Sequence, residues 1–136
     1  MQKVIIEEDL LAQCRKNGDH MLMLLKERLQ SPNALAAPYI FDVRGAGAFF
    51  GIEFEFSDLE ARRIDMKGHQ FAMVAQACCF KNGLVAMGMV GGSTLDGSKG
   101  DVLILGPAYN ATTEEIEKIV DIFVRSIEEV LTENFA

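Results

Sequence analysis

Two glycine-rich segments have the composition of nucleotide-binding loops. Residues 45–51 invite comparison with the dinucleotide fingerprint, and residues 92–99 with a phosphate-binding loop. The fingerprint is G-x-G-x-x-G and opens a helix, whereas this segment reads G-x-G-x-x-x-G and leads into a strand pattern. A phosphate loop needs lysine directly after its second glycine and a helix behind it. Here Ser98 precedes Lys99 and a strand pattern follows, so we expect no nucleotide site.

The histidines and cysteines could in principle bind a metal: His20, His69, Cys14, Cys78 and Cys79. Neighbours on a helix point about 100° apart, so Cys78 and Cys79 do not easily face one ion. No C-x-x-C or H-x-x-x-H spacing exists, and we expect no metal site. A nucleophilic Cys–His pair stays open, because its partners need not be near in sequence, but nothing supports it.

The composition is that of one soluble globular domain, residues 1–136, with 49% hydrophobic and 24% charged residues. A net charge of −7 argues against nucleic-acid binding. No apolar run approaches the roughly 18 residues of a membrane span, and the acidic N-terminus is no signal peptide. Three cysteines, two of them adjacent, argue against a disulfide framework, so we expect a reducing cytoplasm.

The first half of the chain shows helical and then strand periodicity. Residues 3–30 repeat apolar side chains at helical spacing, and Asn17–Gly18 midway leaves one kinked helix or two helices open. Residues 39–56 predict a strand pair, in which alternation places Glu53 and Glu55 on a wet face. The glycines of this segment suggest bulges or close backbone approach.

The second half alternates helices and short strands. We expect a turn-like charged segment at 57–67, a helix at 68–82 ended by Asn82–Gly83, and a strand at 84–87. A flexible loop at 91–100 and a strand at 102–105 follow. Thr112 and Glu115 fit a capping box that opens the last helix. The order predicts an α/β fold of α+β type, a small mostly antiparallel sheet of three or four strands with helices on one face.

Three blocks resemble a known family, and they occur in that family's order and spacing. They are VRGAGAFFGIEFE (Val43–Glu55), NGLVAM (Asn82–Met87) and GDVLILGPAYNATTEEIEKIV (Gly100–Val120). Together they resemble the C-terminal small domain of class III, fold-type I aminotransferases, which depend on pyridoxal 5'-phosphate (PLP). IIEEDLLAQC (Ile5–Cys14) is similar to the helix that leads into this domain. The likeness covers nearly the whole chain.

The resemblance implies an enzyme that transfers an amino group between an amine or amino acid and a keto acid or aldehyde. In the family, PLP is the electron sink, and the large domain supplies the lysine that holds it. None of the seven lysines here lies in a segment like that motif, and Met1 within the first helix suggests truncation. We therefore expect no catalytic and no cofactor-binding residue, and an inactive fragment whose full-length parent binds PLP.

The same resemblance implies two substrate-binding positions, Ile104 and Pro107. Some relatives have an arginine at the position of Ile104, where it binds a substrate carboxylate as a bidentate fork. Isoleucine cannot do so, and Ala108 replaces a second family proline. Carboxylate recognition at this position is therefore in doubt. We interpret Arg44 and Asp101 as structural.

The expected partner is the large PLP-binding domain of the parent. We expect the Met- and Leu-rich side of the first helix to be exposed and to promote a homo-oligomer. The alternative is a freestanding α/β module that binds a ligand or dimerises.

Overall fold

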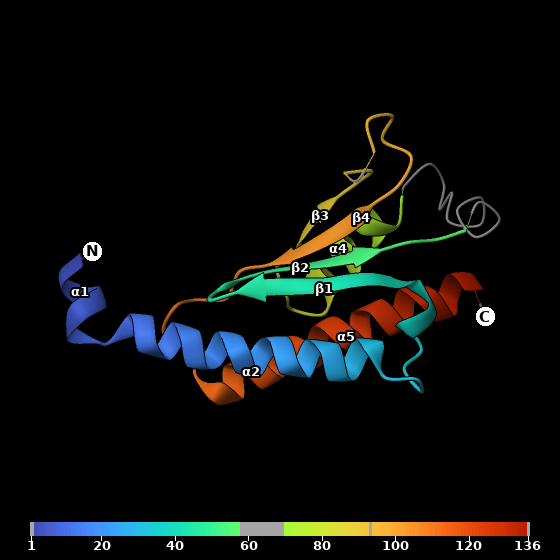
Figure 1. Ribbon diagram of the computed structural model, residues 1–136. Coiled ribbons are helices and arrows are strands. Elements are labelled where there is room, and N and C mark those ends of the chain that lie inside the picture. Colours follow the sequence, from blue (N-terminus) through green and yellow to red (C-terminus); the bar gives the residue numbers. More distant parts are fainter. Residues whose placement is uncertain (1, 58–69, 93, 136) are drawn as a thin grey trace.

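One antiparallel sheet organises the molecule, and helices cover one of its faces (Figure 1). The computed structural model describes residues 2–57, 70–92 and 94–135. Within them the sheet has the order β1-β2-β4-β3. Its strands are β1 (Ile40–Ala46), β2 (Phe49–Phe54), β3 (Met87–Met89) and β4 (Asp101–Leu105). The predicted α+β fold is confirmed, although β3 begins where the expected 84–87 strand ends.

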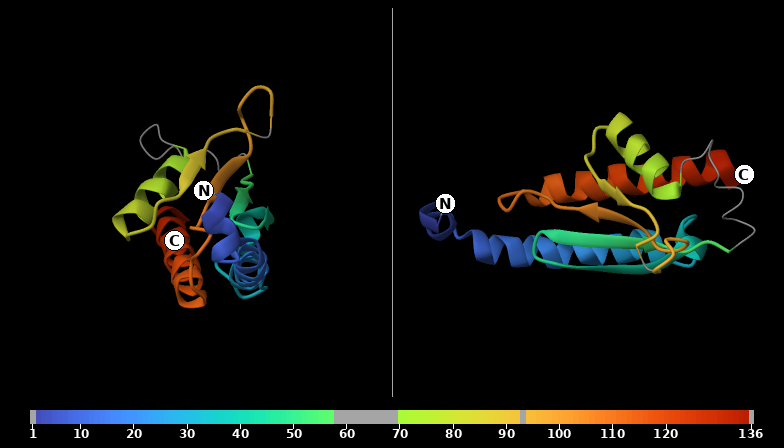
Figure 2. Two further views of the ribbon diagram at one scale, coloured as in Figure 1. Left: turned by 90° about the vertical axis from the view of Figure 1, so that its left-hand side faces the viewer. Right: turned by 90° about the horizontal axis from the view of Figure 1, so that it is seen from above.

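Three helices lie against the same face of the sheet. Figures 1 and 2 show α2 (Leu10–Gln30) and α5 (Thr113–Phe135) on this side, with α4 (Phe71–Lys81) beside β3. Long-range contacts join α2 to α5, such as the ion pair of Arg28 Nη2 with Asp121 Oδ1 at 3.6 Å. Asn17 Nδ2 of α2 also donates to the carbonyl of Ala111, just before α5, at 2.6 Å. A short helix, α1 (Gln2–Glu7), projects from one end, and a 3-10 turn (Ala37–Tyr39) leads into β1. No helix among the described residues is long and apolar enough to cross a membrane.

The first segment is two helices, but the break lies at Asp9 rather than at Asn17–Gly18. Asp9 adopts the left-handed conformation, with φ 51°, and separates α1 from α2. Gly18 instead lies inside α2, where a Cβ atom would be only 2.3 Å from the Gly47 carbonyl oxygen. The glycine is required because helix and hairpin backbones touch there.

A two-residue turn joins β1 to β2 and sets the register in which the two strands pair. Ala46 pairs with Phe49, and Gly47 between them has φ +62°, as glycine does at the first turn position of a type II′ hairpin. The irregularity in the ladder falls between Ile40 and Asp42, so the bulge is not at a glycine. The expected close approach does hold at Gly45, where a Cβ would lie 2.6 Å from the Phe49 carbonyl oxygen.

The hydrophobic core fills the space between the covered face and the helices. Fully buried sheet residues are Val43, Phe50, Ile52, Phe54, Leu103 and Leu105. Phe71 of α4 packs on Phe54, with ring centroids 4.8 Å apart. From α2, Met21, Leu25 and Leu29 are completely buried, so the expectation of an exposed Met- and Leu-rich side is wrong for these residues. Their burial follows from the sheet covering that side of the helix.

Helix ends follow the sequence signals closely. Thr112 Oγ1 accepts from the Glu115 amide at 3.2 Å, and Glu115 Oε2 accepts from the Thr112 amide at 3.0 Å, which confirms the capping box. Gly83 has φ +94°, and the Leu84 amide donates to the Cys79 carbonyl at 2.8 Å, which confirms the stop of α4. The start of α4 is Phe71. Most of the predicted 57–67 segment, and His69, lie outside the described residues.

Candidate functional site

On the face of the sheet opposite the described helices, the open face, two cross-strand rows extend over all four strands, and Ala46 and Phe49 form a further pair. One row runs Asp42, Glu53, Val102, Met89, and the other runs Arg44, Gly51, Ile104, Met87. Both rows are charged on β1 and β2 and apolar on β4 and β3, except that Gly51 has no side chain. This open face is therefore divided into a charged half and an apolar half.

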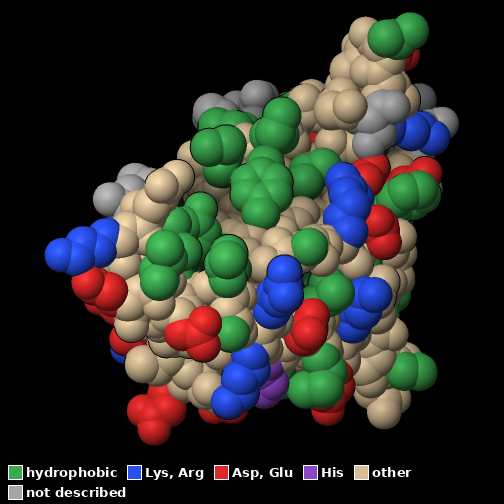
Figure 3. All heavy atoms as spheres, turned by 60° about the vertical axis from the view of Figure 1, so that its left-hand side comes forward, with side chains coloured by type: hydrophobic (Ala, Val, Ile, Leu, Met, Phe, Trp, Pro, Cys, Tyr) green, Lys and Arg blue, Asp and Glu red, His purple; other side chains and the backbone are tan. Residues whose placement is uncertain are grey.

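A hollow of about 550 Å³ lies between the two halves. Its floor includes Gly51, and its walls are mostly apolar side chains, with Arg44 as the charged group. The lining residues are Arg44, Gly45, Ala46, Phe49, Gly51, Met89, Gly92, Val102 and Ile104. Phe49 at one end is 66% exposed and Met89 at the other is 48% exposed. Figure 3 shows hydrophobic side chains gathered on this part of the surface, with basic and acidic side chains beside them.

Arg44 is held by two carboxylates at the margin of this hollow. Its Nη1 donates to Glu53 Oε2 at 2.9 Å and to Asp42 Oδ2 at 3.2 Å. The hydrogen bonds that Arg44 donates to Glu53 and to Asp42 raise the pKa of the guanidinium above its ordinary value, against the opposing effect of burial. Glu53, expected on a wet face, is 92% buried because Arg44 lies on the same face and pairs with it. Arg44 thus pairs with one carboxylate on its own strand and with one on β2.

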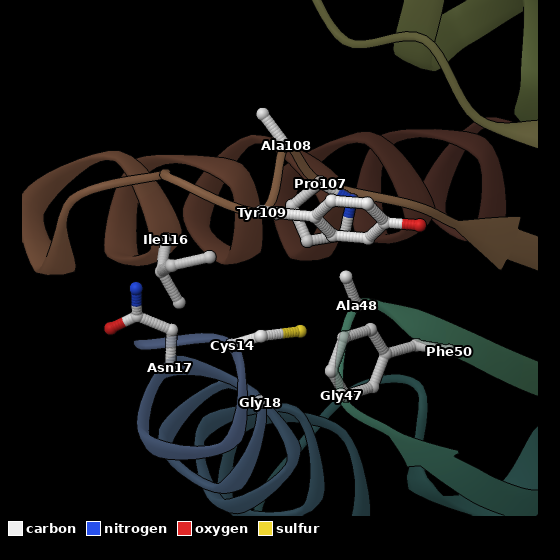
Figure 4. A pocket seen from close by; sticks show the side chains of 10 residues that line it. All are labelled: Cys14, Asn17, Gly18, Gly47, Ala48, Phe50, Pro107, Ala108, Tyr109 and Ile116. Carbon is white, nitrogen blue, oxygen red and sulfur yellow. The ribbon is translucent and has the colours of Figure 1, made fainter. Parts of the chain in front are cut away.

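The two predicted substrate-binding positions lie in different places. Ile104 is half-buried and lines the hollow on the open face. Pro107, beyond the end of β4, lines a separate cavity of about 10 Å³, which holds roughly one water molecule. Figure 4 shows this cavity between α2, the hairpin turn and the start of α5, with Pro107 and Tyr109 on one side and Cys14 on the other. Their role in substrate binding stays a prediction.

Asp101 connects β4 to the start of α4 and to the 91–100 loop. Its Oδ2 accepts from the Ala72 amide in the first turn of α4 at 2.9 Å, and its Oδ1 accepts from the Gly91 amide at 3.3 Å. A carboxylate at a helix N-terminus satisfies a free amide and stabilises the helix dipole. One side chain of β4 therefore caps a helix and anchors the loop, in agreement with its structural interpretation.

The loop tip forms a small hydrogen-bonded turn. Asp96 accepts from the hydroxyl of Ser98 at 2.7 Å and from its amide at 3.1 Å. Hydrogen bonds from Ser98, Thr94 and the Ser98 amide lower the pKa of Asp96 to about 2. Thr94 Oγ1 also accepts from the Lys99 amide at 3.2 Å. These contacts hold the tip of the loop together through its own polar groups.

The cysteines of α4 are unsuited to nucleophilic chemistry. Burial raises the pKa of the Cys79 thiol to about 11, and burial followed by the charge of Glu129 raises the pKa of Cys78. A raised pKa keeps a thiol protonated near neutral pH, where only the thiolate reacts. Asn82 Nδ2 beside them donates to Ser126 Oγ at 2.9 Å, joining α4 to α5. No group of three or more potential metal ligands occurs in the part of the chain that the structure describes.

The hollow does not fit PLP. That cofactor needs a lysine for its carbonyl carbon and free donors for its phosphate. No lysine lines the hollow, and the Nη1 of its arginine is already shared by two carboxylates. The residues that line the hollow therefore do not provide the lysine that the cofactor requires.

Comparison with known proteins relates the chain to aminotransferases. No family model matches it. It is 30% identical over 120 residues to an aminotransferase of Gibberella zeae, a match that covers 88% of this chain and 22% of that protein. It is 25% identical over 125 residues to the uncharacterized aminotransferase YodT of Bacillus subtilis, covering 92% and 26%. The chain thus spans about a quarter of the length of these relatives.

Solved structures give the same relation. An aminotransferase from Bacillus anthracis superimposes with a TM-score of 0.70 at 25% identity, over 93% of this chain and 26% of that one. A transaminase from the marine bacterium Virgibacillus superimposes with a TM-score of 0.73 at 17% identity, over 96% and 27%, and shows the fold alone. The predicted resemblance is confirmed, since the chain corresponds to one portion of an aminotransferase.

Proposed function

We propose that this chain is the C-terminal small domain of a class III, PLP-dependent aminotransferase. The parent transfers an amino group between an amine or amino acid and a keto acid or aldehyde. The observation that carries the proposal is the aminotransferase likeness, which extends over 88% of the chain in sequence and 93% in structure. The three blocks that carry the resemblance form most of β1 with β2, the connection from α4 to the first residue of β3, and β4 with the start of α5.

In this proposal, the large domain of the parent supplies the lysine and binds PLP, which stabilises the carbanion of the reaction. The small domain supplies a wall of the substrate entrance, with Ile104 and Pro107 as its substrate-binding positions. The misfit between PLP and the hollow supports this division. We expect the chain alone to be inactive and to reside in the cytoplasm.

The test uses the purified chain with PLP and an amino donor. We expect no single lysine to be modified by PLP after borohydride reduction, by peptide mass spectrometry, and no keto product above that of free PLP. Specific modification of one lysine together with turnover would show that the catalytic lysine lies within this chain. The coding sequence upstream of Met1 gives an independent result. An open frame with a PLP-lysine segment supports the proposal, and a stop codon there supports a freestanding module.

The freestanding ligand-binding or dimerisation module remains the second candidate. The observation that favours it is the apolar hollow, which is lined by residues of this chain. Both candidates are compatible with a homo-oligomer. The homo-oligomer is supported by the exposure of Val4 and Ile6 on α1 and of Leu11 at the start of α2.

A further inference from the structure

We propose that Asp9 and Gln13 form a joint that holds the short helix α1 out of line with α2 and prevents the two helices from fusing into one. Figure 1 shows α1 turned away from the axis of α2. The joint consists of a backbone bend at Asp9 and a side-chain hydrogen bond from Gln13. It is a property of this chain and does not depend on the proposed aminotransferase function.

The apolar spacing of the sequence favours one continuous helix. Val4, Leu11, Gly18 and Leu25 follow one another at steps of seven residues, which return to nearly the same side of a helix. Gly18 and Leu25 are buried on α2, whereas Val4 and Leu11 are 46% and 66% exposed. Residues 2–17 contain no glycine and no proline, so neither of the strongest helix breakers explains the interruption.

Asp9 supplies the bend in the backbone. Its φ of 51° is left-handed, and in the described part of the chain it is the one residue other than glycine with a positive φ. Aspartate is among the few side chains that tolerate this conformation. The Asp9 amide donates to the Ile6 carbonyl at 3.3 Å, as the amide of a left-handed residue does where it ends a helix. Alanine at this position would favour the helical conformation instead.

Gln13 holds the bend from the side of α2. In a continuous helix, the amide of Ala12 would donate to the carbonyl of Glu8, four residues earlier. In the structure, that carbonyl accepts from Gln13 Nε2 at 2.7 Å. The Gln13 amide donates to the Asp9 carbonyl at 3.2 Å, where α2 begins. The bent form and a straight form therefore compete for the Glu8 carbonyl, and the side chain of Gln13 favours the bent one.

The joint fixes the direction in which α1 leaves the domain. No residue of α1 is buried, so burial in the core does not set its direction, and Figure 2 shows it at the extreme end of the molecule. In the parent proposed above, residues that precede this chain attach to α1, and the joint sets the angle at which they approach. This consequence rests on the proposed function. The joint itself is measured in this chain alone, so failure of one is distinguishable from failure of the other.

Amide hydrogen exchange followed by NMR tests the joint, with Ala12 as the reporter. In the bent form, this amide lies in the first turn of α2, where amides have no partner four residues earlier in the same helix. The double variant Asp9→Ala with Gln13→Ala lacks both restraints. We expect its Ala12 exchange to be at least about tenfold slower than in the wild type, because the helices fuse. Helical carbon chemical shifts should then continue without interruption through residue 9.

The matched control is Asp9→Gly with Gln13→Ala, which differs from the first double variant only at residue 9. Glycine adopts the left-handed conformation readily, so the bend should persist and Ala12 should exchange as in the wild type. Exchange at Leu103, buried on β4, should be closely similar in all these proteins, because α1 has no buried residue. Equal Ala12 exchange in the two double variants would overturn the proposal. Loss of the helical shifts of α1, in the wild type or in the alanine variant, would overturn it as well.

The single variant Asp9→Ala isolates the contribution of Gln13. Because the side-chain hydrogen bond to the Glu8 carbonyl is retained, we expect Ala12 exchange to be slowed less than in the double alanine variant. Equal slowing in the two proteins would remove Gln13 from the joint.

Discussion

Glycine occupies three positions of this protein for three different physical reasons. Gly18 allows two backbones to touch, Gly83 provides a left-handed helix end in open space, and Gly51 leaves a floor empty. Sequence reasoning found the stop at Gly83, because the Asn-Gly signal is local. It could not assign Gly18, since the contact partner is 29 positions away in the hairpin turn, and it treated that glycine as a weakness in a helix.

Substitution of Gly18 by alanine tests the backbone contact. Alanine favours a helix by ~1 kcal/mol, but here its Cβ would meet the Gly47 carbonyl oxygen at 2.3 Å, and backbone cannot move aside cheaply. Overpacking of this kind costs about 1–3 kcal/mol, so we expect net destabilisation in urea unfolding.

Two further glycine variants separate steric contact from backbone strain as causes of destabilisation. Gly83→Ala has no atom to meet but a φ of +94°, and should cost about 1 kcal/mol through backbone strain alone. Gly106→Ala should be nearly neutral. A Gly18→Ala protein as stable as wild type would show that helix α2 does not approach the hairpin so closely.

At the scale of elements, the parts defined by local signals were predictable and those defined by pairing were not. The final helix and its capping box follow from residues within one turn of each other. The bounds of β3 do not, because a three-residue strand is specified by its partner β4 rather than by its own periodicity. The hollow could not be predicted from the sequence for the same reason. Only the register sets Gly51 between Arg44 and Ile104.

Removal of the cap at α5 should weaken the whole domain, because this helix covers much of the core. Thr112→Ala loses the hydroxyl that accepts from the Glu115 amide, and we expect a loss of about 1 kcal/mol in the free energy of unfolding. Thr132→Ala, exposed near the other end of the same helix, is the control and should change stability little. The two variants are compared by urea denaturation. An equal loss of unfolding free energy in both would contradict the role given to the cap.

On the scale of the whole molecule, two regions that expose apolar side chains bear on association. One is the open face, and the other is the N-terminal region, where α1 has no buried residue and Ile6 and Leu11 are 79% and 66% exposed. Figure 2 shows α1 at the extreme end of the molecule, away from the sheet. The sequence predicted that the apolar side of the first helix promotes association, but the sheet covers Met21, Leu25 and Leu29 on α2.

Replacement of the exposed N-terminal side chains tests the homo-oligomer. The double change Ile6→Ser and Leu11→Ser removes apolar area at a projecting end of the molecule, so we expect a lower weight-average mass in sedimentation velocity at high concentration. Met23→Ser, on an exposed position of α2 at 54%, is the control and should leave the mass unchanged. A wild-type chain that stays monomeric throughout would contradict the predicted association.

The ladder irregularity at the start of β1 has a consequence for misfolding. An outermost strand with free amides and carbonyls can recruit another chain into a continuous ribbon, and proteins resist this with bulges or very short outer strands. Here β1 carries the irregularity between Ile40 and Asp42, and β3 at the opposite border is only three residues long. Both borders are poor templates for fibril growth. Association of this chain should therefore remain reversible and should add no cross-β signal.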